Sequence, residues 1–288
     1  VLDSTDPVYI HHALAGDLRE TVDVVGSKSG STIETASQRA LFTEAFRTLN
    51  LDPVDHMVIV TDPGSPLDKS ARADGYIVVN ADPNVGGRFS ALTAFGLVPA
   101  ALIGVDPSVL LDAASDAKKQ ILETDLAIDI AYLISNAGQY LTYCDSAAAP
   151  GLSDWIEQLV AESTGKNEVG RLPVVIENSS AAAGGSAFSI SFSGDADLVI
   201  AGELGEQFFL WEWVTALVGA ALEIDPFNQP NVTEAKEATS ALLAEWNGVL
   251  PEFKADAIDG AVEIFGAGSD LTSALRKFIT AIPDGGYV

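Results

Sequence analysis

The stretch of sequence that decides the fold is residues 21–49, TVDVVGSKSGSTIETASQRALFTEAFRTL. Its first six residues are mostly apolar and β-branched, which predicts a buried strand over 21–26. A run of serine and glycine follows, and apolar residues then recur at helical spacing over about 33–49. The similar runs at 57–61 (MVIVT) and 76–80 (YIVVN) predict further strands. Strands that alternate with helices predict a mainly parallel sheet covered by helices on both faces.

The same alternation continues along the chain. We expect helices over 6–15, 91–122, 124–139, 151–162 and 207–222, strands over 140–144, 172–177 and 197–201, and a small-residue loop at 179–186. The Ala- and Leu-rich segment 91–122 separates two α/β units of similar size. We therefore predict an α/β fold with two domains, residues 1–122 and 123–288.

Composition narrows the functional classes. The chain has 288 residues and a formal net charge of −26, which disfavours nucleic acid and anionic lipid as partners. No apolar run reaches the length that a bilayer crossing needs. The single cysteine, Cys144, cannot form an internal disulfide, so we expect a cytoplasmic protein.

Four segments carry candidate chemistry. In the first, residues 26–35 (GSKSGSTIET), several hydroxyls, glycines and one lysine lie between a predicted strand and a predicted helix. Free backbone amides at a helix N-terminus bind phosphate well. The alternative is an ordinary helix cap provided by Ser31 or Thr32. A lysine in the loop of so acidic a protein favours phosphate.

The second and third segments supply an arginine and a carboxylate. Arg88 follows two glycines in the sequence NVGGRFS (84–90), where it either stabilises an oxyanion or caps a neighbouring helix. Glu162 begins ESTGK (162–166) at the end of a predicted helix, where it either acts as a general base or forms part of a helix C-cap with Gly165 and Lys166.

The fourth segment, FNQPNVTEAK (227–236), places Gln229 in a turn and Lys236 about two helical turns beyond Asn228. In one interpretation, both side chains face the same cleft. In the alternative, Gln229 only forms part of a turn and Lys236 faces solvent on the helix that follows. The nearby Trp211 and Trp213 are expected to serve packing.

In this order, the four segments resemble the phosphoglucose isomerase family, and the resemblance spans roughly residues 1–240. SKSGSTIET is similar to the family's phosphate loop, VGGRFSALTAFG to its glycine–arginine signature, ESTGK to its Glu-Ser-Asn-Gly-Lys segment, and 204–236 to its second signature. The variants ESTGK and FNQPNV are particularly similar to the isomerase part of bifunctional transaldolase/phosphoglucose isomerases. The resemblance implies two sugar-isomerase (SIS) domains, each a three-layer αβα sandwich.

The resemblance also implies an activity, the interconversion of glucose 6-phosphate and fructose 6-phosphate through a cis-enediolate, without a metal or other cofactor. It implies roles for individual residues. Glu162 would move the proton, Arg88 would stabilise the enediolate, and Lys236 would assist ring opening. The substrate and its phosphate would be held by the remaining residues of the segments, Ser27, Lys28, Ser29, Thr32, Gln158 and Gln229.

Three departures from the family pattern shape our expectations. The family's Gly-Gly-Ser loop would precede Val1, no histidine follows His56, and Asn231 and Thr233 replace the usual Gly and Glu. We therefore expect a fragment that is nearly inactive alone, in a homo-oligomer or fused to a transaldolase domain. The alternatives are a non-catalytic sugar-phosphate-binding module and an inert fragment.

Overall fold

The computed structural model describes residues 2, 4, 6–177, 187–249, 251–266 and 268–283. The predicted loop at 179–186 lies outside these residues. The chain divides into two compact units, residues 1–228 and 229–288, and each is described below by itself. None of the helices in the described ranges combines the length and the apolar character needed to cross a bilayer.

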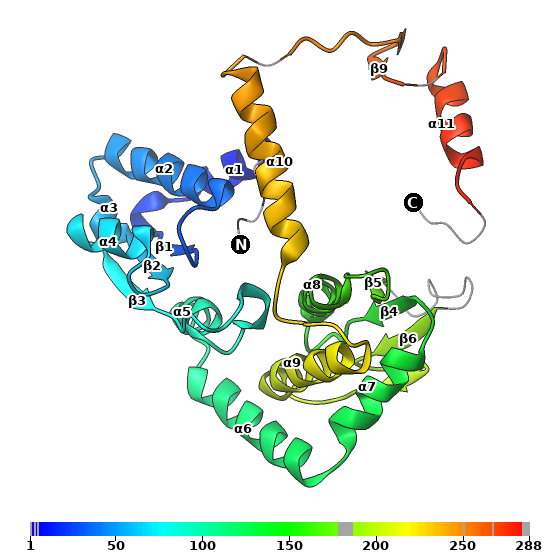
Figure 1. The fold of residues 1–288 in the computed structure, drawn as a ribbon. Coiled ribbons are helices and arrows are strands. Elements are labelled where there is room, and N and C mark those ends of the chain that lie inside the picture. The colour runs from blue at the N-terminus through cyan, green and yellow to red at the C-terminus, as the bar shows by residue number, and fades with distance from the viewer. Residues whose placement is uncertain are drawn as a thin grey trace. The chain divides into compact units, whose positions relative to one another are not determined.

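The first sheet of the first unit confirms the strands predicted around residues 21–26, 57–61 and 76–80. It has the order β1-β2-β3, with β1 at Asp23–Gly26, β2 at Met57–Thr61 and β3 at Ile77–Asn80, all parallel (Figure 1). Its helices are α1 (Pro7–Leu14), α2 (Ile33–Thr48), α3 (Pro53–His56), α4 (Pro66–Ala73) and α5 (Ala94–Leu102). Short 3₁₀ turns occupy Leu18–Glu20 and Gly87–Phe89.

The second sheet of this unit has the order β5-β4-β6-β7 and is also entirely parallel. Its strands are β4 (Tyr140–Cys144), β5 (Leu172–Val175), β6 (Phe188–Ser191) and β7 (Leu198–Val199). The helices α6 (Pro107–Glu123), α7 (Leu126–Asn136), α8 (Leu152–Thr164) and α9 (Leu204–Ala221) complete this part of the chain. The parallel α/β class that the sequence predicts is confirmed. The domain boundary at residue 122 stays a prediction.

The predicted helix over 91–122 is wrong in one respect, because the structure contains two helices there. α5 ends at Leu102, and Gly104 then adopts a φ of +91°, a conformation that glycine tolerates best. Asp106 caps the next helix by accepting a hydrogen bond from the amide of Ser108, and Pro107 occupies its first turn. The sequence therefore contains residues typical of a turn, Gly104 and Pro107, but they lie within a run of residues that favour helix.

The larger core lies around the second sheet. Trp211 and Val214 of α9 are buried with Ile156 and Leu159 of α8 and with Tyr143 of β4. α8 and α9 lie side by side in Figure 1 and are in contact. Burial of large apolar side chains is the main favourable term in folding, so this core fixes α8 as a rigid support. α8 carries Gln158 and Glu162.

The second unit comprises α10 (Pro230–Trp246), the antiparallel strands β8 (Ala257–Asp259) and β9 (Val262–Ile264), and α11 (Leu271–Thr280).

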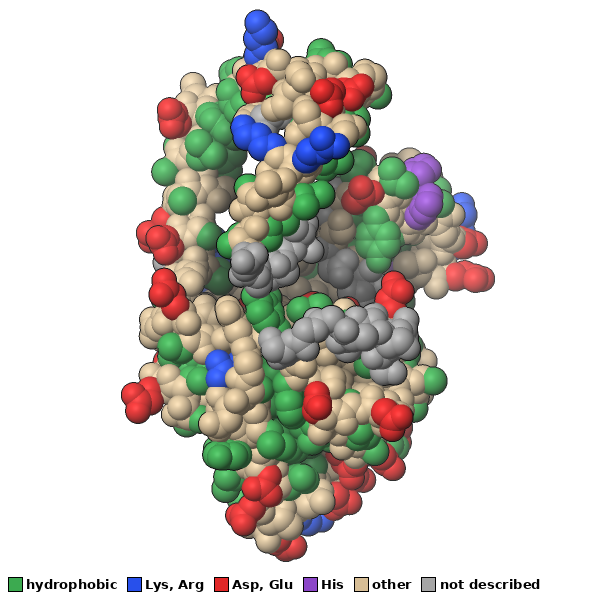
Figure 2. Space-filling model, turned by 90° about the vertical axis from the view of Figure 1, so that its right-hand side faces the viewer, with side chains coloured by type: hydrophobic (Ala, Val, Ile, Leu, Met, Phe, Trp, Pro, Cys, Tyr) green, Lys and Arg blue, Asp and Glu red, His purple; other side chains and the backbone are tan. Residues whose placement is uncertain are grey.

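Acidic side chains are spread widely over the face drawn in Figure 2, and basic ones are sparse there, as the net charge of −26 requires.

Candidate functional site

Arg88 is a buried cation with several fixed partners. It lies in the 3₁₀ turn Gly87–Phe89 and is 4% exposed. Its Nε donates a hydrogen bond to Oγ of Ser163 over 2.7 Å, and one terminal nitrogen donates to the backbone carbonyls of Pro226 and Asn228. The guanidinium is planar and has several N–H donors, so it can donate to all these acceptors at once. The ammonium of a lysine lacks this planar set of donors.

Glu162 lies beside this guanidinium. The distance from its Oε2 to a terminal nitrogen of Arg88 is 3.5 Å, and its side chain is 34% exposed while that of Arg88 is 1% exposed. Gln158, one turn earlier on α8, donates a hydrogen bond to Oε1 of Glu162 over 2.9 Å. The structure thus brings together three of the predicted site residues, Arg88, Gln158 and Glu162. The cation of Arg88 is buried, and the carboxylate of Glu162 is partly exposed to solvent.

Lys166 adds a second buried cation, and Gly165 is the C-cap residue of α8, as in the alternative interpretation of ESTGK, but without the left-handed conformation that this interpretation expects there. Gly165 has a φ of −67°, so it does not adopt the left-handed conformation. The Lys166 ammonium donates hydrogen bonds to the carbonyl oxygens of Asp225 and Asn228. The end of α8 and the turn containing Arg88 therefore both hold the backbone of residues 225–228.

Burial and neighbouring charges act together on these cations. Burial lowers the pKa of the Arg88 guanidinium, and the carboxylates of Glu162 and Asp225 act in the opposite direction. Burial also lowers the pKa of Lys166, and the positive charge of Arg88 lowers it further. Two positive charges close together in a partly buried site favour a negative group between or beside them.

The predicted phosphate loop joins β1 to α2. Oγ of Ser27 accepts a hydrogen bond from the amide of Gly30 over 3.1 Å, and the hydroxyls of Ser29 and Ser31 are 2.6 Å apart. Thr32 is the N-cap residue of α2, but its side chain makes no capping hydrogen bond. The hydroxyl-capped alternative is therefore wrong, and the N-terminus of α2 has no side-chain cap.

Lys28 in this loop already has an anionic partner. Its ammonium lies 2.9 Å from Oδ1 of Asp62, which directly follows β2. Sequence reasoning missed this pair. The signal was available, because β1 and β2 are adjacent parallel strands whose carboxyl ends meet at one edge of the sheet. An anion bound at the loop would have to share Lys28 with Asp62.

Gln229 and Lys236 belong to the second unit. Gln229 is the N-cap residue of α10, and Lys236 is an exposed residue of the same helix. Their proposed roles stay predictions. His11 and His12 are exposed on α1.

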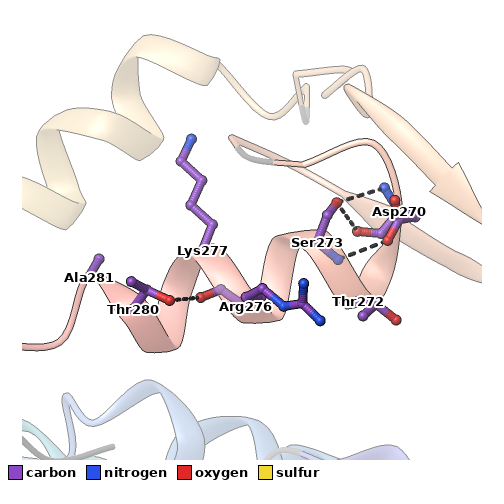
Figure 3. Close-up of a pocket in the computed structure, with 7 residues that line it drawn as sticks. All are labelled: Asp270, Thr272, Ser273, Arg276, Lys277, Thr280 and Ala281. Carbon is purple, nitrogen blue, oxygen red and sulfur yellow. Dashed lines mark hydrogen bonds between the residues drawn. The ribbon is translucent and has the colours of Figure 1, made fainter.

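One further pocket lies in the second unit, along α11. Figure 3 shows Arg276 and Lys277 pointing away from each other on this helix. Asp270 is occupied as the helix cap, since it accepts a hydrogen bond from the amide of Ser273 over 2.8 Å. None of the predicted site residues lines this pocket. Within the described residues, no group of three or more His, Cys, Asp or Glu side chains is arranged to hold a metal.

Comparison with known proteins reveals distant relatives. A probable glucose-6-phosphate isomerase of Methanococcus maripaludis is 33% identical over 186 residues, which are 60% of this chain and 42% of that protein. A glucose-6-phosphate isomerase of a Synechococcus strain is 36% identical over 182 residues, 58% of this chain and 34% of that protein. This chain thus spans less than half the length of these curated relatives. No family model matches the sequence.

Solved structures extend the similarity to most of the chain. A hypothetical protein of Thermus thermophilus superposes with a TM-score of 0.74 at 26% identity, covering 84% of this chain and 76% of that one. A glucose-6-phosphate isomerase of Chlamydia trachomatis gives a TM-score of 0.68 at 20% identity, covering 86% and 64%. The second match shows a common fold alone. Together the comparisons show that this α/β chain is distantly related to glucose-6-phosphate isomerases.

Proposed function

We propose that this chain carries the proton-transfer site of an aldose–ketose isomerase that acts on a phosphorylated hexose, glucose 6-phosphate or fructose 6-phosphate. The observation that carries the proposal is the pair of Arg88 and Glu162, 3.5 Å apart, with the cation buried and the carboxylate partly exposed. The distant relationship to glucose-6-phosphate isomerases supports the same reaction class.

The chemistry follows from the two side chains. The Glu162 carboxylate takes a proton from C2 of the open-chain aldose, and the electron pair of the broken C–H bond forms the enediolate. Arg88 stabilises the negative oxygen, because its charge is permanent and its position is fixed before reaction. Glu162 then returns the proton to C1 while the proton of the C2 hydroxyl passes to O1, so that C2 becomes the carbonyl carbon of the ketose. The Gln158 amide orients the carboxylate through its hydrogen bond to Oε1.

The phosphate would bind at the loop between β1 and α2. The uncapped N-terminus of α2 offers backbone amides, and Ser27, Ser29 and Thr32 contribute hydroxyls near it. Lys28 would add one positive charge, which Asp62 partly neutralises. This arrangement would anchor an anion in a protein whose overall charge repels it.

The remaining predictions complete the proposal. Lys236 would assist ring opening and Gln229 would line the site. A cytoplasmic location and a homo-oligomeric state or a fused transaldolase domain, as in the bifunctional enzymes, stay predictions. No metal or other cofactor is required by the proposed steps.

Binding of an enediolate mimic tests the proposal. We expect 5-phosphoarabinonate, whose planar carboxylate resembles the enediolate, to bind more tightly than fructose 6-phosphate in calorimetry. Fructose without its phosphate should bind much more weakly. Arg88→Lys should lower the affinity for the mimic at least ~10-fold, whereas Arg47→Lys on α2 should leave it unchanged. Equal affinity of the Arg88 variant and the wild type, with the fold intact by circular dichroism, would overturn the proposal.

A further inference from the structure

The first unit contains a cavity that does not include the pair of Arg88 and Glu162. It has a volume of about 690 Å³, which suits a small organic molecule. Its walls come from the loop after β3, from Lys28, from one side of α9 and from Phe227. Neither Arg88 nor Glu162 lines it.

The polar feature of this cavity is Glu212, which α9 places between two tryptophans in the sequence WEW. Its Oε1 is buried and has no hydrogen-bond partner in the part of the chain that the structure describes. A buried polar atom without a partner destabilises the folded state, so a carboxyl placed this way calls for an explanation. Since the last torsion of a glutamate is broad and roughly two-fold, a rotation of about 180° exchanges its two oxygens.

The walls around Glu212 are mainly aromatic. Phe209 and Trp213 stack with their ring centroids 6.0 Å apart, and Phe89 and Phe227 form a second pair at 5.2 Å. Trp213 is 41% exposed and Phe227 63% exposed, so both rings are accessible from solvent. Aromatic faces attract cations, and apolar walls exclude water from the contact.

The charges around the cavity also favour a cation. Lys28 is the other ionisable residue among those lining it, and Asp62 pairs with its ammonium at 2.9 Å. The chain as a whole carries a formal charge of −26. A positively charged ligand is therefore drawn to this protein, and the Glu212 carboxyl offers it a specific partner.

We propose that this cavity is a binding site for a small organic cation, an amine or guanidine that bears an aromatic or aliphatic body, with Glu212 as its counter-ion and the rings of Phe209, Trp213 and Phe227 as its walls. The site does not include the proton-transfer pair of Arg88 and Glu162, although it shares Lys28 with the proposed phosphate loop. Its test does not depend on turnover, so the two proposals fail independently.

Ligand binding at this site is coupled to the loss of a proton from the Glu212 carboxyl. Burial raises the pKa of Glu212 to about 8, so the carboxyl is mostly protonated at neutral pH. A cation pairs with the carboxylate, and its binding therefore releases the proton. Affinity should rise with pH until Glu212 is ionised in the free protein.

Calorimetry with a matched pair of probes tests this inference. Benzylguanidinium keeps its charge throughout the working range, and benzylurea is a neutral compound of nearly the same shape. We expect benzylguanidinium to bind about 10-fold more tightly at about pH 9 than at about pH 7, in line with the raised pKa. At the higher pH, benzylurea should bind at least ~10-fold more weakly than benzylguanidinium, because it lacks the charge.

Two variants locate the effect. Glu212→Gln keeps the shape of the protonated side chain and should abolish both the pH dependence and the preference for the cation. Glu223→Gln, just after α9 and outside the cavity, should behave as the wild type. Absence of benzylguanidinium binding at about 1 mM, equal binding of the two probes, or unchanged binding by Glu212→Gln would each overturn the inference.

Discussion

The guanidinium of Arg88 and the ammonium of Lys166 donate hydrogen bonds to the same acceptor, the backbone carbonyl of Asn228, over 3.3 and 2.7 Å. Two cations from distant parts of the sequence therefore hold one turn of the chain. Each also binds a further carbonyl of that turn, Pro226 for Arg88 and Asp225 for Lys166. The position of Arg88 beside Glu162 depends on this shared anchor.

Lys166 should consequently act as a positioning residue. Lys166→Met removes the donor to two partly buried carbonyls, so we expect the free energy of unfolding to fall by about 1–3 kcal/mol. We also expect weaker binding of 5-phosphoarabinonate, because Arg88 loses its fixed position. Denaturant unfolding and calorimetry measure the two effects. Lys118→Met, an exposed lysine of α6, is the control. A Lys166 variant with wild-type stability and affinity would contradict the positioning role.

Gly30 is required by the geometry of the proposed phosphate loop. Its φ is +77°, and a Cβ there would lie 2.4 Å from Cβ of Leu67. Gly64 has a similar φ of +72°, but a Cβ there would meet nothing within 4 Å. Both alanine variants carry the cost of the left-handed backbone, and Gly30→Ala adds a steric clash. We expect Gly30→Ala to be less stable than Gly64→Ala by about 1–3 kcal/mol in denaturant unfolding. Equal stabilities would show that the loop shifts without cost.

Glu212 makes stability depend on pH in a specific direction. Its pKa in the folded protein is raised from 4.5 to about 8. The folded state therefore holds the proton more tightly, and the contribution of Glu212 is fully present below about pH 4.5 and is lost as the pH rises toward 8. Gln mimics the protonated form and has no proton to lose.

We therefore expect Glu212→Gln to match the wild type near pH 4.5 and to be more stable near pH 8, by on the order of 2–4 kcal/mol. Thermal unfolding across this range measures the difference. Glu123→Gln, at an exposed position of α6, should show no such trend. A constant difference between Glu212→Gln and the wild type at all pH values would mean that Glu212 ionises normally.

Much of the architecture follows from local sequence patterns. The strands β1 to β5 and the helices α2, α7, α8 and α9 were predicted from apolar periodicity to within a few residues. β6 was not, because its short sequence FSIS lacks the continuous apolar run of the other strands, although its alternation of apolar residues and serine is typical of a half-buried strand. The turn between α5 and α6 was missed because Ala and Leu on both sides favour helix.

The candidate site could be predicted only in part. The sequence motifs identified Arg88 and Glu162 separately as candidate site residues. Their ion pair, however, depends on how the two sheets and α8 pack. The Lys28–Asp62 pair and the shared carbonyl of Asn228 also arise from tertiary contacts. Glu212 has no sequence signature beyond its place in an apolar helix. Its unusual pKa comes from burial, which only the three-dimensional structure contains.

The central claim is that Glu162 moves a proton between C1 and C2 of the sugar phosphate. The most direct measurement is deuterium incorporation into fructose 6-phosphate in D₂O, followed by NMR over days so that slow turnover is detected. We predict enzyme-dependent labelling at C1 that Glu162→Gln lowers at least ~10²-fold, while Glu157→Gln on the same helix has no effect. Labelling at the wild-type rate by Glu162→Gln would contradict the account.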